Sequence, residues 1–376
     1  MSPAAPRVAI VSDPLVQRGG AERVVEAMAE LFPDAPVYAL LYSPETGPAA
    51  LRARVTASSL GRVPGAARRH RWLLPFYPAA IERFDLRGFD AIVSSHHTVA
   101  KGVLRGADQV HVCYCHTPMR ALWERPHDEL AAIAAPLRPF AERLLSRLRA
   151  WDLATAARVD RFVANSATTQ RRIRAHYGRD SAIVYPPIDT DRFTPGGEAQ
   201  DYYLVASRLV PYKRIDVALA AAAMLGRRVL VAGSAGEDRR LAMPGVELLG
   251  HVDDDRLVAL MRGARGLLFP QYEDFGMTPV EMMACGRPVV AYGRGGALET
   301  VIDGVTGVLA DDQTPLAFAS AMRRLESQSW SSERIRRHAE RFSKARFNDG
   351  LAQIVARAWA QRDEPARFAG EYARHG

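Results

Sequence analysis

Short apolar runs of strand length alternate with helical patterns along nearly the whole chain, and this rhythm is the feature that most restricts its fold. In the first half the apolar runs lie at Val8–Val11, Val37–Leu41, Ala91–Val93, Val110–Tyr114 and Arg161–Ala164, and the helical patterns at Ala21–Leu31, Pro139–Val159 and Thr168–His176. Strands and helices in alternation form parallel sheets covered by helices. The chain is therefore predicted to be an α/β protein.

The same rhythm restarts after a break rich in proline and glycine. Because proline biases the preceding residue away from helix, we expect 185–197 to be extended and hinge-like. Beyond it the apolar runs lie at Tyr202–Ala206, Arg228–Ala232, Val246–Leu249, Gly266–Phe269, Pro288–Ala291 and Gly307–Leu309, and the helical patterns at Arg214–Leu225, Asp254–Arg262, Pro279–Ala284 and Pro315–Leu325. A chain of 376 residues exceeds what one core usually holds. Two doubly wound domains are predicted, with ligands at the carboxyl ends of their strands.

Cysteine content and apolar run length both favour the cytoplasm. Three cysteines cannot form a disulfide framework. No apolar run approaches the ~18–20 residues that span a bilayer, and the residues before Val8 lack a signal-peptide pattern. We expect a cytoplasmic protein.

The net positive charge of the chain comes entirely from its first half. Residues 1–180 contain 25 Lys and Arg against 17 Asp and Glu, whereas the remaining 25 basic and 25 acidic residues cancel. Between Glu45 and Glu82 there is no acidic residue, and the segment holds Arg52, Arg54, Arg62, Arg68, Arg69 and Arg71, followed by the aromatic stretch Trp72–Pro78. This segment suits the inner, anionic membrane surface, where each basic residue near the lipid contributes about 1 kcal/mol to the free energy of membrane binding. Nucleic acid and a solvated loop beside a core segment are the alternatives.

The densest chemical pattern follows the strand-like run that ends at Phe269. A loop leads into a helix, and Glu273 in the loop precedes Glu281 in the helix by eight residues. Unpaired N–H groups at a helix start attract phosphate, and Gly276 permits close approach to the backbone. The two carboxylates could accept hydrogen bonds from hydroxyl groups at opposite ends of a sugar nucleotide. Exposed glutamates also reach this spacing by chance, but the surrounding Gly, Met and Pro make the segment uncommon.

The segment Glu273-Asp274-Phe275-Gly276-Met277, with Glu281, resembles the E-x7-E motif of retaining glycosyltransferases, especially glycosyltransferase family 4. The stretches 284–291 and 295–300 resemble that family too, and the likeness covers essentially the whole chain. It implies the GT-B fold, two Rossmann-like domains with the active site between them. It also implies that Glu273 binds hydroxyls of the donor sugar and Glu281 the ribose, within a donor site that includes Phe275, Gly276, Met277 and Thr278.

Two cations follow the first strand of the second half. Arg208 lies at the predicted strand end and Lys213 at the helix start, where they could straddle a diphosphate. Such residues are usually surface charges, but in the resembling family this pair stabilises the departing nucleotide diphosphate and no metal is required. Asp253-Asp254-Asp255 has the spacing of a metal-binding Asp-x-Asp pair. It falls where a helix N-cap is expected, so we predict capping and no metal or other cofactor.

Gly19 and Gly20 connect the first strand to the first helix, where a backbone without side chains can approach an anion. The sequence contains neither a G-x-G-x-x-G dinucleotide motif nor a P-loop, so NAD and ATP lose support. In the resembling family this glycine pair lies near the diphosphate and the acceptor.

A histidine, His116, stands at the predicted end of another strand. Cys113 and Cys115 precede it on one face of that strand, but no second ligand pair supports a zinc site. The resemblance makes His116 the histidine that contacts the donor sugar, although a lone histidine is more often a core polar group. His96 and His97, at a further strand end, are candidates for the acceptor side.

The family likeness is greatest to bacterial mannosyltransferases that build O-antigen or exopolysaccharide from GDP-mannose. It implies a catalytic set of His116, Arg208, Lys213 and Glu273, retention of anomeric configuration without a protein nucleophile, and a saccharide acceptor linked to polyprenyl diphosphate. A UDP- or ADP-glucose-dependent transferase and a non-catalytic nucleotide-sugar- or polyanion-binding protein are the alternatives. Nucleic acid is not expected as a partner, because the charge is confined to one half. The expected domains are 1–186, joined by a returning helix within 343–376, and 187–342.

Overall fold

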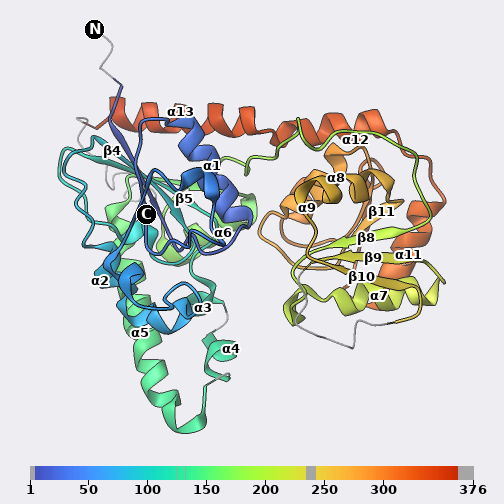
Figure 1. Ribbon diagram of the computed structural model, residues 1–376, viewed down its shortest axis with the longest axis horizontal. Coiled ribbons are helices and arrows are strands. Elements are labelled where there is room, and N and C mark those ends of the chain that lie inside the picture. Colours follow the sequence, from blue (N-terminus) through green and yellow to red (C-terminus); the bar gives the residue numbers. More distant parts are fainter. Residues whose placement is uncertain (1–4, 125, 132, 234–242, 363–376) are drawn as a thin grey trace, which may run out of the picture. The chain divides into compact units, whose positions relative to one another are not determined.

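The computed structural model describes residues 5–124, 126–131, 133–233 and 243–362, which form two compact units (Figure 1). Among the described residues, the amino-terminal unit comprises those within 5–164, 169–184 and 348–362, and the carboxy-terminal unit comprises those within 165–168 and 185–347. After the short excursion at 165–168, the chain passes to the second unit beyond Val184 and returns to the first within its last described helix. The final part of the expected tail, 363–376, lies outside the described residues.

The amino-terminal unit is built on a parallel sheet with, among the described residues, seven strands in the order β3-β2-β1-β4-β5-β6-β7. Their bounds are β1 Val8–Ser12, β2 Val37–Ala39, β3 Val55–Ala57, β4 Ala91–His96, β5 Val110–Cys115, β6 Arg161–Ala164 and β7 Ser181–Ile183. Every residue of β1, β4 and β5 is buried, as expected of strands covered on both faces. The strand order reverses between β1 and β4, which marks the position where such sheets bind ligands.

Helices follow most of these strands. They are α1 Gly20–Leu31, α2 Tyr77–Ile81, α3 Arg120–Trp123, α4 Pro126–Ala131, α5 Arg138–Thr155 and α6 Ala167–Tyr177, with 3-10 turns η1 Ala49–Leu51, η2 Ser59–Arg62, η3 His70–Phe76, η4 Ala100–Gly102, η5 Ala135–Leu137 and η6 Ala156–Arg158. Figure 1 shows α5 extending well beyond the sheet of its own unit, with α4 beside its far end.

The sheet of the carboxy-terminal unit has six parallel strands among the described residues, in the order β10-β9-β8-β11-β12-β13. They are β8 Tyr203–Ala206, β9 Val229–Ala232, β10 Val246–Gly250, β11 Gly266–Phe269, β12 Val289–Tyr292 and β13 Gly307–Ala310. Successive strand residues alternate between two hydrophobic clusters: Leu204, Leu267 and Val289 belong to one, and Val205, Leu268 and Val290 to the other. The sheet therefore has a core on each face, and its strand order reverses between β8 and β11.

The helices that cover this second sheet form two groups (Figure 1). One core cluster contains side chains of α8 (Asp254–Gly263), α9 (Met277–Ala284) and α12 (Ser332–Ala339), and the other contains side chains of α7 (Ile215–Met224) and α11 (Pro315–Glu326). The remaining elements are the turns η7 Pro211–Lys213 and η9 Glu340–Phe342 and the helices α10 Ala297–Thr300 and α13 Lys344–Ala360.

The predicted α/β class and the two doubly wound sheets are confirmed, and the differences lie in short elements. The edge strands β3 and β7, three residues each, were not predicted, because their residues are only partly buried or exposed and lack a continuous apolar run. Short helices such as α2, α3 and α10 were missed for lack of a long periodic pattern. Within the described residues, no helix combines the length and apolar character needed to cross a bilayer.

Candidate active site

The two expected cations and the first expected glutamate lie at the strand-order reversal of the carboxy-terminal unit. Arg208 follows β8, Lys213 ends the turn η7 that leads into α7, and Glu273 follows β11. Because β8 and β11 are adjacent, the loops after them meet at the carboxyl edge of the sheet.

Direct contacts join these residues into one cluster. The Lys213 ammonium forms an ion pair with Oε1 of Glu273, and both side chains are largely buried. The Arg208 guanidinium donates a hydrogen bond of 3.0 Å to the Tyr212 hydroxyl, and the Lys213 ammonium lies 5.4 Å from the centre of the Tyr212 ring. Tyr212 was not predicted as a site residue, and its position one residue before Lys213 is the signal that could have indicated it.

Two glycine positions shape the loop that carries Glu273. Gly276 has φ +85°, a conformation that favours glycine, and it caps α9 at its start. Gly296 donates its main-chain N–H to the Glu273 carbonyl at 2.9 Å. A Cβ atom at Gly296 would lie 2.3 Å from Cα of Phe275, so only glycine fits there. Gly296 therefore holds the Glu273 loop in place, a role that sequence reasoning missed.

The other expected donor residues lie deeper in the unit. The Phe275 ring is buried in the hydrophobic core, with ring centres 5.5 Å from both Tyr185 and Phe342. Glu281 lies inside α9 and is buried, and Met277 and Thr278, the first two residues of that helix, are partly buried. The donor contacts assigned to these four residues stay predictions.

The acidic run before α8 caps that helix. Asp253 is the N-cap residue, and its carboxylate accepts the main-chain N–H of Arg256 at 2.8 Å, which confirms the predicted cap. Within the described part of the chain, no three His, Cys, Asp or Glu side chains gather in a cluster that could hold a metal ion.

In the amino-terminal unit, the predicted glycine loop carries a buried carboxylate. Gly19 is the N-cap of α1, and Gly20 is its first residue. The Glu22 carboxylate folds back to accept the main-chain N–H groups of Gly19 and of Glu22 itself and the side-chain amide of Gln17. Burial raises the pKa of Glu22, and the hydrogen bonds and His97 offset this in part. This is the glutamate half of a capping box. The G-x-x-E spacing is the signal that could have found it.

A second carboxylate holds the loop after β4. Asp13, which follows β1, accepts main-chain N–H groups of the four residues 97–100 at 2.6–3.1 Å. The His97 ring is about one third exposed, and its Nδ1 lies 2.8 Å from the Thr98 hydroxyl. Because β1 and β4 flank the strand-order reversal, Asp13 and Glu22 fix both loops at that edge. His96, by contrast, is fully buried beneath them.

His116, directly after β5, lies beside the same edge. Its Nε2 is 2.8 Å from the Ser95 hydroxyl, and its ring centre is 6.2 Å from that of His97. Desolvation lowers the pKa of His116 to about 3, so its imidazole is neutral near pH 7. The structure therefore brings His116 and His97 together, as a polar pair available for hydrogen bonding.

The two cysteines of β5 belong to the hydrophobic core. Cys113 and Cys115 are buried in a cluster with Phe162, Ile173 and Tyr177 among others. Burial raises the pKa of both thiols, so they stay protonated, which disfavours the thiolate form that binds zinc.

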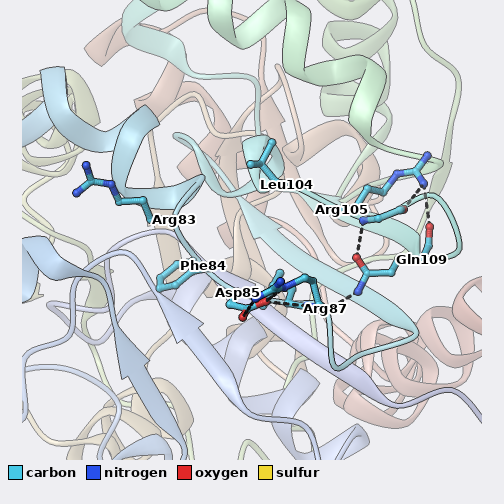
Figure 2. Close-up of a pocket in the computed structure, with 9 residues that line it drawn as sticks. Arg83, Phe84, Asp85, Arg87, Leu104, Arg105 and Gln109 are labelled. Carbon is cyan, nitrogen blue, oxygen red and sulfur yellow. Dashed lines mark hydrogen bonds and ion pairs between the residues drawn. The ribbon is translucent and has the colours of Figure 1, made fainter.

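A separate shallow pocket of about 450 Å³ opens at the opposite, amino-terminal edge of the first sheet, among the loops before β4 and β5 (Figure 2). Two of its arginines have partners: Arg87 forms an ion pair of 2.7 Å with Asp85, and Arg105 one of 2.9 Å with Asp160. The Gln109 side chain accepts the main-chain N–H of Gly106 and donates to the Leu86 carbonyl, so it joins the loops before β5 and β4. The pocket is therefore held by its own contacts and lies away from the strand-order reversal.

The carboxy-terminal cluster has the chemistry of a diphosphate and sugar site. Arg offers a planar fork and Lys a compact charge for phosphate oxygens, and a neighbouring carboxylate accepts sugar hydroxyls. The carboxyl edge of the sheet in the amino-terminal unit offers the hydroxyl and imidazole groups of Ser95, His97 and His116, which suit an uncharged polyol.

Comparison with known proteins agrees with this chemistry. Residues 188–342 match the family model "Glycosyl transferases group 1", and residues 18–192 match "Glycosyltransferase Family 4". A D-inositol 3-phosphate glycosyltransferase of Mycolicibacterium vanbaalenii is 30% identical over 328 residues, 76% of this chain and 71% of the relative. The corresponding protein of Geodermatophilus obscurus is 34% identical over 240 residues, 54% of this chain and 53% of the relative. The chain thus spans only about half the length of several curated relatives.

Solved structures share the fold at low sequence identity. HepE of Anabaena, in complex with UDP and glucose, is 18% identical with a TM-score of 0.68, covering 94% of this chain and 100% of that one. A sucrose-phosphate synthase of Thermosynechococcus elongatus is 17% identical with a TM-score of 0.70 and the same coverage. The carboxy-terminal domain of the chain matches the group 1 model. Together, the sequence matches and the shared fold show that the chain belongs to glycosyltransferase family 4 and has the GT-B fold.

Proposed function

We propose that the protein transfers a hexose from a nucleotide sugar to a saccharide acceptor with retention of anomeric configuration. The observation that carries this proposal is the cluster of Arg208, Lys213 and Glu273 at the strand-order reversal of the carboxy-terminal unit. The relatives are named as glycosyltransferases, which supports glycosyl transfer, and the UDP bound to the structural neighbour HepE supports a nucleotide-sugar donor.

In the proposed reaction the acceptor hydroxyl attacks the sugar carbon from the leaving-group face, and the departing phosphate oxygen takes its proton. The protein's contribution is electrostatic. Arg208 and Lys213 hold the charge that develops on the diphosphate, and Glu273 binds hydroxyls of the sugar. Because Lys213 is already paired with Glu273, its ammonium is positioned before the donor arrives. The neutral His116 would donate or accept a hydrogen bond at the sugar without adding charge.

We further propose mannose, delivered from GDP-mannose without a metal ion, as the transferred sugar. The motif resemblance supports mannose. The second candidate is a UDP-glucose donor, which is favoured by the UDP and glucose bound to HepE. ADP-glucose remains a third possibility to be included in the same test.

For the acceptor we propose a saccharide linked to polyprenyl diphosphate, used in synthesis of surface polysaccharide. The protein would then be cytoplasmic and peripheral on the inner face of the membrane, with the arginine-rich segment 52–71 toward the lipid. Arg52, Arg62, Arg68 and Arg69 are exposed, as this orientation requires.

Calorimetric titration with GDP, UDP, ADP and GDP-mannose, in the presence of a chelator, tests the donor proposals. Lys213→Ala should weaken, without abolishing, binding of the preferred nucleoside diphosphate, whose charge resembles the charge that develops on the leaving group. Arg228→Ala should not change this binding, because Arg228, at the start of β9, forms an exposed ion pair of 2.7 Å with Glu247 away from the carboxyl edge. Binding of UDP alone would remove the mannose proposal, and no nucleotide binding at all would remove the transferase proposal.

A further inference from the structure

We propose that the far end of α5 docks on an anionic lipid surface, as a second attachment point beside the arginine-rich segment. The proposal rests on the membrane-side acceptor proposed above and names the partner surface and the residues that contact it. Figure 1 shows α5 extending from its unit, with its amino-terminal end farthest from the sheet.

The apolar stripe of α5 continues past the part of the helix that is packed. Leu145 and Leu148 are buried in a cluster with Met119 and Leu122, and Leu144 packs against it. One turn before Leu144 on the same stripe, Phe140 is 70% exposed, and Leu137, the last residue of η5 and the N-cap of α5, is 58% exposed. The outer end of the stripe therefore faces solvent instead of a core.

A second exposed apolar site lies in η3. In η3, Trp72 is 83% exposed and Phe76 is 59% exposed, while Leu74 between them packs against the cluster that holds α5. Leu144, one turn from Phe140, packs against that same cluster, so the two exposed sites belong to two segments that meet one cluster of the amino-terminal unit. Four large exposed apolar side chains on these two segments exceed the scattered exposure that is ordinary for a surface.

The charges around these side chains favour an anionic partner. From 133 to 150 the chain has four arginines and a single acid, Glu142, and Arg138, Arg143 and Arg147 are exposed. The segment between Glu45 and Glu82, which contains Trp72 and Phe76, has no acid. Two further acids, Asp128 and Glu129, belong to α4, which lies beside the far end of α5, so the four arginines of 133–150 outnumber the acids of the two segments together by one.

Aromatic and aliphatic side chains interleaved with arginine suit the boundary between lipid headgroups and acyl chains. A second copy of the chain fits less well, because a two-fold interface through this surface would set arginine against arginine. Nucleic acid would use the arginines but leaves the Leu137 and Phe140 side chains without an apolar partner. We therefore assign the surface to lipid.

Sedimentation with phosphatidylcholine vesicles, with and without phosphatidylglycerol, tests the assignment. Wild type should bind the anionic vesicles, and Leu137→Ser/Phe140→Ser should weaken binding roughly tenfold or more, as expected for removing two inserted apolar groups. The matched control is Met224→Ser/Leu316→Ser in the other unit, whose side chains are 56% and 71% exposed, and it should bind as wild type does. Arg143→Ala/Arg147→Ala should weaken binding to anionic vesicles without altering the small affinity for neutral ones.

Equal vesicle binding by wild type and Leu137→Ser/Phe140→Ser would overturn the proposal, as would no binding by wild type or a dimer that dissociates on this substitution. Preference for DNA over anionic vesicles would also overturn it. Thermal melting identifies any variant that fails to fold. If Leu137→Ser/Phe140→Ser does not fold, the vesicle binding of Arg143→Ala/Arg147→Ala tests the proposal instead, and binding equal to that of wild type would overturn it. Nucleotide titration of the same samples separates the two proposals: vesicle binding without nucleotide binding would leave the docking surface standing and remove the transferase.

Discussion

Removing one partner of the buried ion pair between Lys101 and Asp152 should strongly destabilise the amino-terminal unit. Both residues are fully buried, and Nζ of Lys101 lies 2.8 Å from Oδ1 of Asp152. The other carboxylate oxygen accepts Nε1–H of Trp123 at 2.7 Å and the Tyr177 hydroxyl at 2.9 Å. One carboxylate in α5 thus ties together η4, α3 and α6, and it holds the inner end of the projecting helix.

Asp152→Ala removes this acceptor and leaves a buried ammonium without its counter-charge. Breaking a buried pair from one side costs about 3–5 kcal/mol. The Trp123 and Tyr177 donors also lose their acceptor, which places the expected loss toward the upper part of that range. For a unit of this size, such a loss lowers the melting temperature by about 6–20 °C, since each kcal/mol shifts it by about 2–4 °C.

Differential scanning calorimetry is the suitable assay, because two units need not unfold as one transition. Only the transition of the amino-terminal unit should move. Asp85→Ala is the matched control: it breaks an ion pair of 2.7 Å with Arg87 on the surface of the same unit, where a pair contributes about 0–1 kcal/mol. Lys101→Met/Asp152→Leu should recover much of the loss, since apolar replacement of a whole buried pair is often neutral or stabilising. A shift for Asp152→Ala no larger than that for Asp85→Ala would refute the reasoning.

Three further outcomes are expected. Lys213→Ala should lower kcat about 10²–10³-fold, equivalent to about 2.7–4 kcal/mol, in a steady-state transfer assay, while Arg228→Ala leaves it unchanged. Gly296→Ala should weaken nucleotide binding in calorimetry, because its Cβ would meet the backbone at 2.3 Å and displace the Glu273 loop. Glu22→Gln should melt no lower than wild type at pH 7, whereas Glu22→Ala should melt lower. Burial raises the pKa of Glu22 in the folded state, so ionisation costs stability as pH rises through that pKa, and the advantage of the Gln variant should vanish toward pH 4.5.

Most of the fold could be predicted from the sequence because its central strands are buried on both faces. Such strands appear as apolar runs, as at 8–11 and 110–114, whatever lies around them. The edge strands β3 and β7 could not be found this way, because one side of an edge strand has no neighbour and its side chains are partly exposed. The Lys101–Asp152 pair was also beyond sequence reasoning, since nothing local links residues 51 positions apart.

The candidate site was partly predictable for a different reason. Each expected residue follows a strand, and the carboxyl ends of parallel strands share one edge, so a sequence that locates strands also locates the loops able to bind a ligand. What the sequence does not contain is the order of the strands. Lys213 meets Glu273, 60 residues further along, because β8 and β11 are neighbours at the reversal. Asp13 meets the loop after β4 for the same reason, 84–87 residues away. In both units, pairing order decides which strand-end residues become one site.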